Sequence, residues 1–202
     1  MRFNIFENYI ILIILYNMII FQEDTKYFVF LHIPKNGGKY IRSTILNSNS
    51  NKVIKSYWGV EENLDLAHIP YMLKDKLINN NINYNFFTYS RNPYHRIISA
   101  FFYRNPDKNV NDFKNFIKNT LASYHFSLKF DNNMIHYYPQ YLFVCNENLI
   151  IEKQITIYKF EELENPKLYN LTSFFDNKCI KIINKIYFKD FLTFNYEIIK
   201  KI

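Results

Sequence analysis

Apolar and polar residues alternate along the chain in blocks that predict strands and helices in turn. Segments rich in aromatic and β-branched residues predict three strands, at 27–33, 85–90 and 155–160. Apolar residues spaced three and four positions apart predict helices at 39–46, 94–103, 112–121 and in part of 179–202. Residues 65–78 are expected to form a loop that enters a helix. Strands that alternate with helices indicate an α/β fold with a parallel sheet, in which ligands bind at the carboxyl ends of the strands.

A further apolar stretch precedes the first of these strands. Residues 9–21 are 13 positions long, which as a helix is about 20 Å and short of a bilayer core of roughly 30 Å. Two interpretations stay open: a signal anchor over 3–21, which would place the protein at a Golgi or secretory membrane, and a helix packed on the domain of a cytoplasmic protein. The predicted organisation is an apolar N-terminal segment over 1–26 and a single domain over 27–202.

The chain is basic, with 25 Lys and Arg against 18 Asp and Glu and a formal net charge of +7. A positive charge favours anionic partners such as phosphorylated cofactors and acidic glycans. The basic residues are scattered and form no nucleic-acid motif, so we expect no nucleic acid partner. The two cysteines, Cys145 and Cys179, form either one disulfide or two free thiols. No Cys or His cluster has the spacing of metal ligands, and we expect no metal.

Two of the three glycines in the chain are adjacent, at Gly37 and Gly38, directly after the first predicted strand. They lie in the segment Pro34-Lys35-Asn36-Gly37-Gly38-Lys39-Tyr40, which leads into the first predicted helix. Glycine lets the backbone approach a ligand closely or adopt positive φ. A strand, a glycine-containing turn and a helix form the usual frame that binds phosphate through backbone N–H groups. The segment therefore predicts a phosphate-binding loop.

A second anion site is indicated after the strand at 85–90. Arg91 follows this strand directly, and Ser99 lies two turns into the helix that Pro93 begins. A guanidinium group binds two phosphate oxygens at once, and a nearby hydroxyl adds another hydrogen bond. Two anion sites at the ends of two strands suggest a ligand with two phosphate groups.

These two segments resemble the two cofactor signatures of the sulfotransferases. The resemblance is to the family 2-like branch, which sulfates carbohydrates. That branch carries an I-P-K-T-G-G-T-S loop followed by an R-D-P-Y-x-R-x-x-S-x-F motif. Four further segments are similar to its later elements: His68-Ile69-Pro70-Tyr71, His136-Tyr137-Tyr138-Pro139-Gln140, Tyr158-Lys159-Phe160-Glu161-Glu162-Leu163 and, as a Y-x-x-D-F-x-x-F-x-Y pattern, residues 187–196. The matches keep the same order and extend from residue 27 to residue 196, which makes the resemblance specific.

The resemblance implies a P-loop-like three-layer sandwich with a central parallel sheet flanked by helices. It also implies transfer of a sulfuryl group from 3'-phosphoadenylyl sulfate (PAPS) to an acceptor hydroxyl, expected on a carbohydrate. In that role residues 34–40 would bind the 5'-phosphosulfate, and Lys35 would neutralise the charge of the leaving group. Arg91 and Ser99 would bind the 3'-phosphate. His68 is the candidate general base, because imidazole titrates close to neutral pH.

The chain departs from the family pattern where Asn36, Lys39 and Tyr40 replace the usual Thr, Thr and Ser. A P-loop kinase or NTPase is an alternative, but it requires G-x-x-x-x-G-K-[ST], and Gly38-Lys39-Tyr40 lacks both the spacing and the magnesium-binding hydroxyl. A second alternative is an inactive sulfotransferase-like domain that binds acidic glycan. Glu161 and Asp190 can be structural hydrogen-bond acceptors, and His32 is expected to be a buried residue with its hydrogen bonds satisfied.

Overall fold

The computed structural model describes residues 18–202, which form two compact units. The first unit comprises residues 18–89 and 143–158, and the second comprises residues 90–142 and 159–202. The single domain that the sequence predicts over 27–202 stays a prediction; residues 18–26, from the predicted N-terminal segment, belong to the first unit.

The first unit is built on a five-stranded sheet with the strand order β3-β1-β2-β6-β7. The bounds of the strands are β1 Met18–Glu23, β2 Lys26–Phe30, β3 Asn51–Tyr57, β6 Tyr84–Ser90 and β7 Ile155–Lys159. β2 and β6 pair in parallel, as the sequence predicts, and they precede the two segments that contain Lys35 and Arg91. β1 pairs antiparallel with both β2 and β3, so the sheet is mixed and not purely parallel. The predicted α/β class is confirmed.

Strand β1 corrects the interpretation of the apolar stretch at 9–21. Its last four residues, 18–21, are buried in β1 and do not form a helix. In this strand Ile19 lies opposite Phe30 of β2 and Ser56 of β3. Residues 1–17 lie outside the described part of the chain, so the signal anchor stays a prediction. Within residues 18–202, no helix has both the length and the apolar character needed to span a bilayer.

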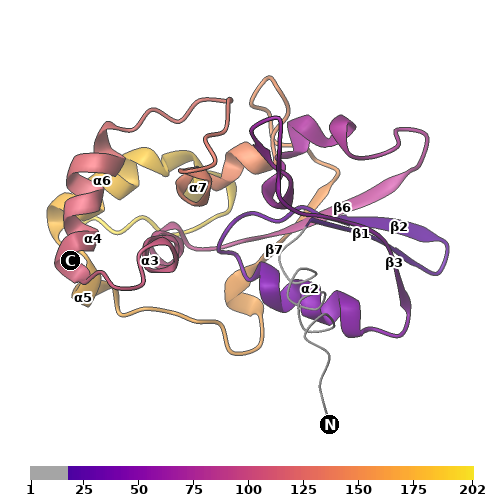
Figure 1. The fold of residues 1–202 in the computed structure, drawn as a ribbon. Coiled ribbons are helices and arrows are strands. Elements are labelled where there is room, and N and C mark those ends of the chain that lie inside the picture. Colours follow the sequence, from indigo (N-terminus) through magenta and orange to yellow (C-terminus); the bar gives the residue numbers. More distant parts are fainter. Residues whose placement is uncertain (1–17) are drawn as a thin grey trace, which may run out of the picture. The chain divides into compact units, whose positions relative to one another are not determined.

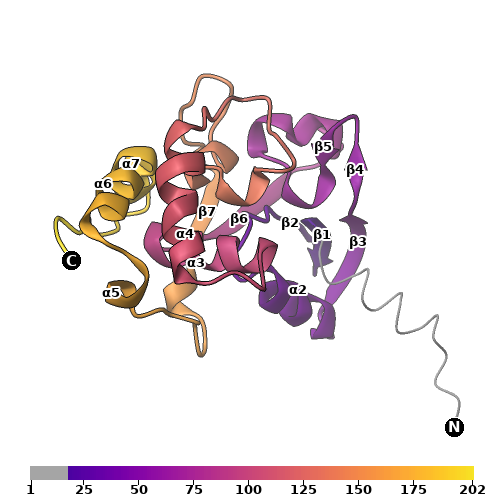
Figure 2. The same cartoon turned by 60° about the vertical axis from the view of Figure 1, so that its left-hand side comes forward.

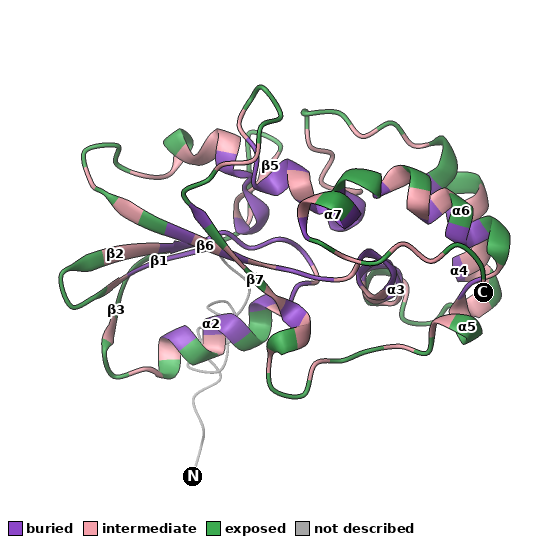
Figure 3. Cartoon of the chain, turned by 180° about the vertical axis from the view of Figure 1, so that it is seen from behind, coloured by how far each residue is buried: buried purple, intermediate pink, exposed green. Residues whose placement is uncertain are grey.

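Helices cover both faces of this sheet and make three layers in the first unit. The helix α2 (Gly38–Asn47) lies on one face (Figures 1 and 3). The opposite face carries two short 3-10 helices, η1 (Leu66–His68) and η2 (Tyr71–Lys76), which follow the small hairpin of β4 (Val60–Glu61) and β5 (Leu64–Asp65). The sequence predicts a loop that enters a helix over 65–78, and the structure forms a pair of 3-10 turns there. Asp65 begins the first of them, because its carboxylate accepts the N–H of Ala67 at 2.9 Å.

The second unit is mainly helical (Figure 2). Its helices are α3 Pro93–Arg104, α4 Val110–Asn115, α5 Leu171–Phe174, α6 Asn177–Ile186 and α7 Phe188–Thr193. A π-turn (Phe116–Thr120) and a 3-10 turn (Leu121–Ser123) continue α4, which accounts for the longer helix that the sequence predicts there. Further 3-10 turns are η5 Ile135–Tyr137, η6 Gln140–Phe143 and η7 Phe160–Glu162. The buried faces of α3, α4, α6 and α7 form one core rich in aromatic residues.

Candidate functional site

The glycine-containing loop connects β2 to α2 in the first unit. Lys35 and Gly37 both have positive φ, 70° and 80°, and Gly37 immediately precedes the first residue of α2. The first N–H groups of a helix have no partner within the helix, and they attract anions together with the helix dipole. Asn36 is buried and donates its Nδ2 to the carbonyl oxygen of Tyr89 at 2.6 Å, which ties the loop to the end of β6. Lys35 is half-buried, and Lys39 and Tyr40 are exposed.

Gly38 is required because the ring of His32 packs against its Cα. A Cβ atom at position 38 would lie 1.9 Å from Nε2 of His32 and 2.3 Å from its Cδ2, which no side chain tolerates. The other ring nitrogen of His32, Nδ1, lies 2.8 Å from a guanidinium nitrogen of Arg42 on α2. Both side chains are buried, at 8% and 1% exposed. His32 is thus a buried residue with hydrogen bonds, as the sequence predicts.

His68 lies beside this loop, on the same unit. Its Nδ1 is 3.0 Å from the backbone carbonyl oxygen of His32, and the two imidazole rings have centroids 4.4 Å apart. A carbonyl oxygen only accepts hydrogen bonds, so Nδ1 of His68 carries a proton, and whenever the ring is neutral Nε2 holds the lone pair. This is the tautomer that a general base at Nε2 requires. The structure therefore places the predicted base and the predicted phosphate loop next to each other.

Arg91 begins the second group of predicted site residues, in the second unit. Its side chain is buried, lies over the ring of Phe160 at 4.2 Å from the centroid, and donates to the carbonyl oxygen of Lys167. Burial lowers the pKa of the guanidinium group, with Tyr169 and Glu161 acting in the opposite direction. The site thus holds a positive charge away from bulk water, where its interaction with an anion is strengthened.

His95 and Ser99 follow Arg91 on one face of α3, because they are four residues apart. Both are half-buried. Nδ1 of His95 accepts the backbone N–H of Tyr169 at 3.1 Å. Burial, and next the charge of Arg91, lower the pKa of His95. His95 is therefore neutral near pH 7 and does not compete with Arg91 as a cation.

Gln140 and Asp190 hold the backbone of Arg91 in place. The N–H of Arg91 donates to Oε1 of Gln140 at 2.9 Å, and Nε2 of Gln140 donates back to the Arg91 carbonyl oxygen at 2.8 Å. The Asp190 carboxylate accepts the backbone N–H groups of Gln140 and Tyr141, at 2.8 and 2.9 Å. Burial raises the pKa of Asp190 to about 6, although the charge of Arg96 and the N–H donors act in the opposite direction. Two motifs distant in sequence thus converge on Arg91.

Glu161 also holds the chain next to Arg91, through hydrogen bonds that its carboxylate accepts. Its Oε1 accepts the N–H of Asn92, and its Oε2 accepts the hydroxyl of Tyr196, both at 2.8 Å. The Tyr196 hydroxyl also lies 3.2 Å from the hydroxyl of Ser90. Glu161 and Asp190 are therefore structural acceptors, as the sequence allows.

A sequence model of the sulfotransferase family matches residues 18–178, which is more than half of the chain. The chain belongs to the sulfotransferase family. The matched range begins with strand β1 and includes the phosphate loop, His68 and the segment from Arg91 to Ser99. No curated protein and no solved structure matches the chain in the corresponding searches.

Sequence reasoning about this sulfotransferase missed Arg42 and the function of Gln140. The buried residues of α2 are Gly38, Ile41, Arg42 and Ile45, a spacing typical of a buried helix face. A charged residue on such a face signals a buried partner, which here is His32. Gln140 had no such signal, since its two hydrogen bonds to the backbone of Arg91 join residues 49 positions apart.

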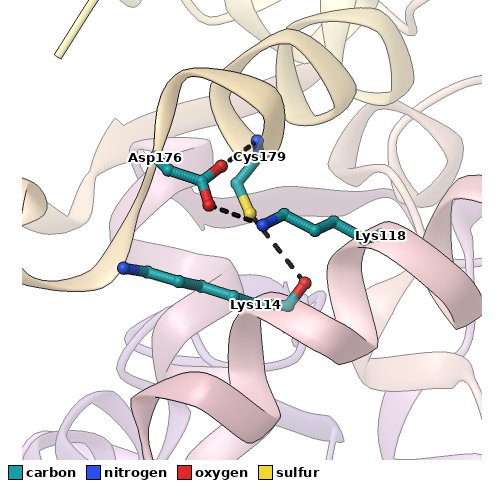
Figure 4. Close-up of polar contacts among 4 residues, drawn as sticks. All are labelled: Lys114, Lys118, Asp176 and Cys179. Atoms are coloured by element: carbon teal, nitrogen blue, oxygen red, sulfur yellow. Dashed lines mark hydrogen bonds and ion pairs between the residues drawn. The ribbon is translucent and has the colours of Figure 1, made fainter.

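The two cysteines of this sulfotransferase, Cys145 and Cys179, are buried and form no disulfide with each other. Cys179 lies in the first turn of α6, where Asp176 accepts its N–H at 2.9 Å and Lys118 binds Asp176 at 2.6 Å (Figure 4). The hydrogen bond from Lys118 lowers the pKa of Asp176 to about 2, and burial raises the pKa of Cys179 to about 11. Cys179 is thus protonated at neutral pH and unsuited to nucleophilic chemistry. Among residues 18–202, no three His, Cys, Asp or Glu side chains are grouped closely enough to hold a metal ion.

Proposed function

We propose that this sulfotransferase transfers a sulfuryl group from PAPS to an acceptor hydroxyl, on a carbohydrate. The observation that carries the proposal is the contact of His68 with His32, the residue whose ring packs against Gly38 of the phosphate loop. The base-competent tautomer of His68 is held by the carbonyl oxygen of His32, three residues before Lys35. A general base and a phosphosulfate-binding loop are the two elements that sulfuryl transfer to a hydroxyl requires.

The donor would be bound by the two groups of predicted residues. Backbone N–H groups from Lys35 to Lys39 suit the 5'-phosphosulfate, because they include the start of α2 and the two residues with positive φ, Lys35 and Gly37. The buried guanidinium of Arg91 and the hydroxyl of Ser99 suit the 3'-phosphate, which distinguishes PAPS from an ordinary nucleotide.

In the proposed step, Nε2 of His68 takes the proton of the acceptor hydroxyl while its oxygen forms a bond to sulfur. The bond between sulfur and the bridging phosphate oxygen breaks, and its electron pair stays on that oxygen. The products are a sulfate ester, adenosine 3',5'-bisphosphate and a protonated His68. Lys35 neutralises the charge that develops on the leaving oxygen. The formal net charge of +7 supports an acidic glycan as acceptor.

Calorimetry with adenosine 3',5'-bisphosphate and with ATP-Mg²⁺ tests the donor, and labelled PAPS with a panel of glycans tests the transfer. We expect tight binding of the bisphosphate and labelling of one glycan class.

The Arg91→Ala variant is expected to bind the bisphosphate about 10- to 100-fold more weakly, because a hydrogen bond to a charged group contributes roughly 1.5–3 kcal/mol. Arg104→Ala, at the exposed end of α3, is the matched control. Binding of ATP-Mg²⁺ alone would indicate an NTPase, and binding of neither nucleotide an inactive glycan-binding domain.

The His68→Ala variant is expected to lower kcat about 10²- to 10⁴-fold, the usual contribution of general base catalysis. Its affinity for adenosine 3',5'-bisphosphate should stay within about twofold of wild type, because a base acts on the acceptor and a twofold change is less than about 0.5 kcal/mol. Steady-state kinetics with labelled PAPS measures both effects when combined with calorimetry. His125→Ala, an exposed histidine of the second unit, is the control. Full activity of His68→Ala would show that another group accepts the proton.

A further inference from the structure

We propose that His32 is a positioning residue, which holds the base His68 at a fixed distance from the phosphate loop through its hydrogen bond to Arg42. The proposal rests on the proposed function, because it assumes that His68 is the base. His32 itself has no assigned role in the transfer, and it lies two residues beyond β2.

His32 touches both parts of the site in the first unit. Its backbone carbonyl oxygen lies 3.0 Å from Nδ1 of His68, and its ring is 4.4 Å from the His68 ring. On its other side, the Nε2 edge of its ring occupies the space where a side chain of Gly38 would begin. A displacement of His32 therefore moves the base and the first turn of α2 relative to each other. A misplacement of about 1 Å can lower a reaction rate roughly 10²-fold.

Arg42 determines which way the His32 ring faces. A guanidinium group has only N–H donors, so Nδ1 of His32 must accept at the 2.8 Å contact. Neutral His32 consequently carries its proton on Nε2, on the edge that lies against Gly38. A proton on Nδ1 would place two donors against each other at a buried position, and a doubly protonated ring would add a second positive charge beside Arg42; both are strongly unfavourable. Arg42 thus allows a single tautomer and a single ring orientation.

If His32 only filled space, its effect on kcat would depend on the volume of its side chain. If Arg42 holds it in position, the effect depends on the acceptor atom Nδ1. Two variants separate these roles. His32→Asn loses much of the ring volume but places an amide oxygen near the position of Nδ1. His32→Phe keeps a planar ring, somewhat larger than imidazole, and removes the acceptor of the 2.8 Å contact with Arg42.

We expect kcat to decrease in the order wild type, His32→Asn, His32→Phe, with the phenylalanine variant about 10- to 100-fold below wild type. The affinity of His32→Phe for adenosine 3',5'-bisphosphate should stay within about threefold, a change of less than about 1 kcal/mol. Thr88→Val is a matched stability control, because it removes a buried 2.6 Å hydrogen bond to the carbonyl oxygen of Leu31 without changing His32. It is expected to lower Tm and leave kcat unchanged. The reverse order, with phenylalanine above asparagine, would overturn the proposal.

Nitrogen-15 NMR of the imidazole rings tests the arrangement in the wild-type protein, even if a variant fails to fold. We expect the Nε2–H tautomer for His32 and the Nδ1–H tautomer for His68. Any other combination overturns the proposal. Failure of the proposed function has a different signature: wild type then neither binds adenosine 3',5'-bisphosphate nor transfers sulfate, while the two tautomers remain as stated.

Discussion

Replacing Lys35 with methionine is expected to lower kcat of sulfuryl transfer about 10²- to 10³-fold, the usual loss when one preorganised donor to a developing negative charge is removed. Methionine keeps the unbranched stem of lysine and removes only the ammonium group. Lys35 is half-buried and has positive φ, so its backbone is committed to the loop before any ligand arrives. Labelled PAPS and the accepted glycan give kcat and the KM of the donor.

The separate effects of Lys35→Met on kcat and on KM show how Lys35 acts. A group that stabilises the leaving oxygen mainly in the transition state lowers kcat, whereas a group that binds ground state and transition state equally changes only KM. Lys26→Met, at the exposed start of β2, is the control for the loss of one positive charge from the first unit. A Lys35→Met enzyme with wild-type kcat and a raised KM would show that Lys35 serves only donor binding.

The central strands and the helices beside them could be predicted because their residues carry strong local signals. The run at 85–90 is nearly the observed β6, and the helix predicted at 94–103 differs from α3 by one residue at each end. Pro93 occupies the first turn of α3, where its missing N–H costs nothing, and Asn92 accepts the N–H of Tyr94 at 3.0 Å. Local chemistry thus determines where this helix begins.

Strands β1 and β3 could not be predicted, for opposite reasons. β1 ends a continuous apolar run, and such a run fits a buried strand as well as a helix. Only its pairing with β2 and β3, which lie later in the chain, decides the matter. β3 is one of the two edge strands of the sheet, and its residues 52–55 are all exposed. An exposed edge strand needs no apolar alternation, so the segment resembles a polar loop.

The residues of the candidate site also fall into those that the sequence predicts and those that it does not. Lys35, Arg91 and Ser99 belong to contiguous motifs, and the resemblance to sulfotransferases identifies them from the sequence. The residues that hold them come from distant segments: Gln140 is 49 positions from Arg91, and His68 is 36 positions from His32. Their partners are set by the tertiary fold, and a single sequence carries no direct record of such contacts.

The Asp190→Ala variant is expected to lose about 3–5 kcal/mol of free energy of unfolding, because it leaves the buried charge of Arg96 without its negative neighbour. Asp190 is 0% exposed and Arg96 is 1% exposed. The backbone N–H groups of Gln140 and Tyr141 also lose their acceptor. Urea unfolding at pH 7.5 measures the loss, with the exposed Asp107→Ala as control. A loss below about 1 kcal/mol, as for an ordinary surface substitution, would contradict this account.

The stability of wild type should also depend on pH through Asp190. Burial raises its pKa to about 6 from an ordinary value of 3.8, so the folded state binds this proton more tightly than the unfolded state does. The resulting stabilisation is complete below about pH 4 and is lost as the pH rises through about 6. It amounts to about 3 kcal/mol, at roughly 1.4 kcal/mol for each pKa unit. Asp190→Asn cannot titrate, so the difference in free energy of unfolding, wild type minus variant, should increase by about 2 kcal/mol between pH 7.5 and pH 4.5. A difference that stays constant over this range would place the pKa of Asp190 near its ordinary value, with Arg96 and the N–H donors offsetting the cost of burial.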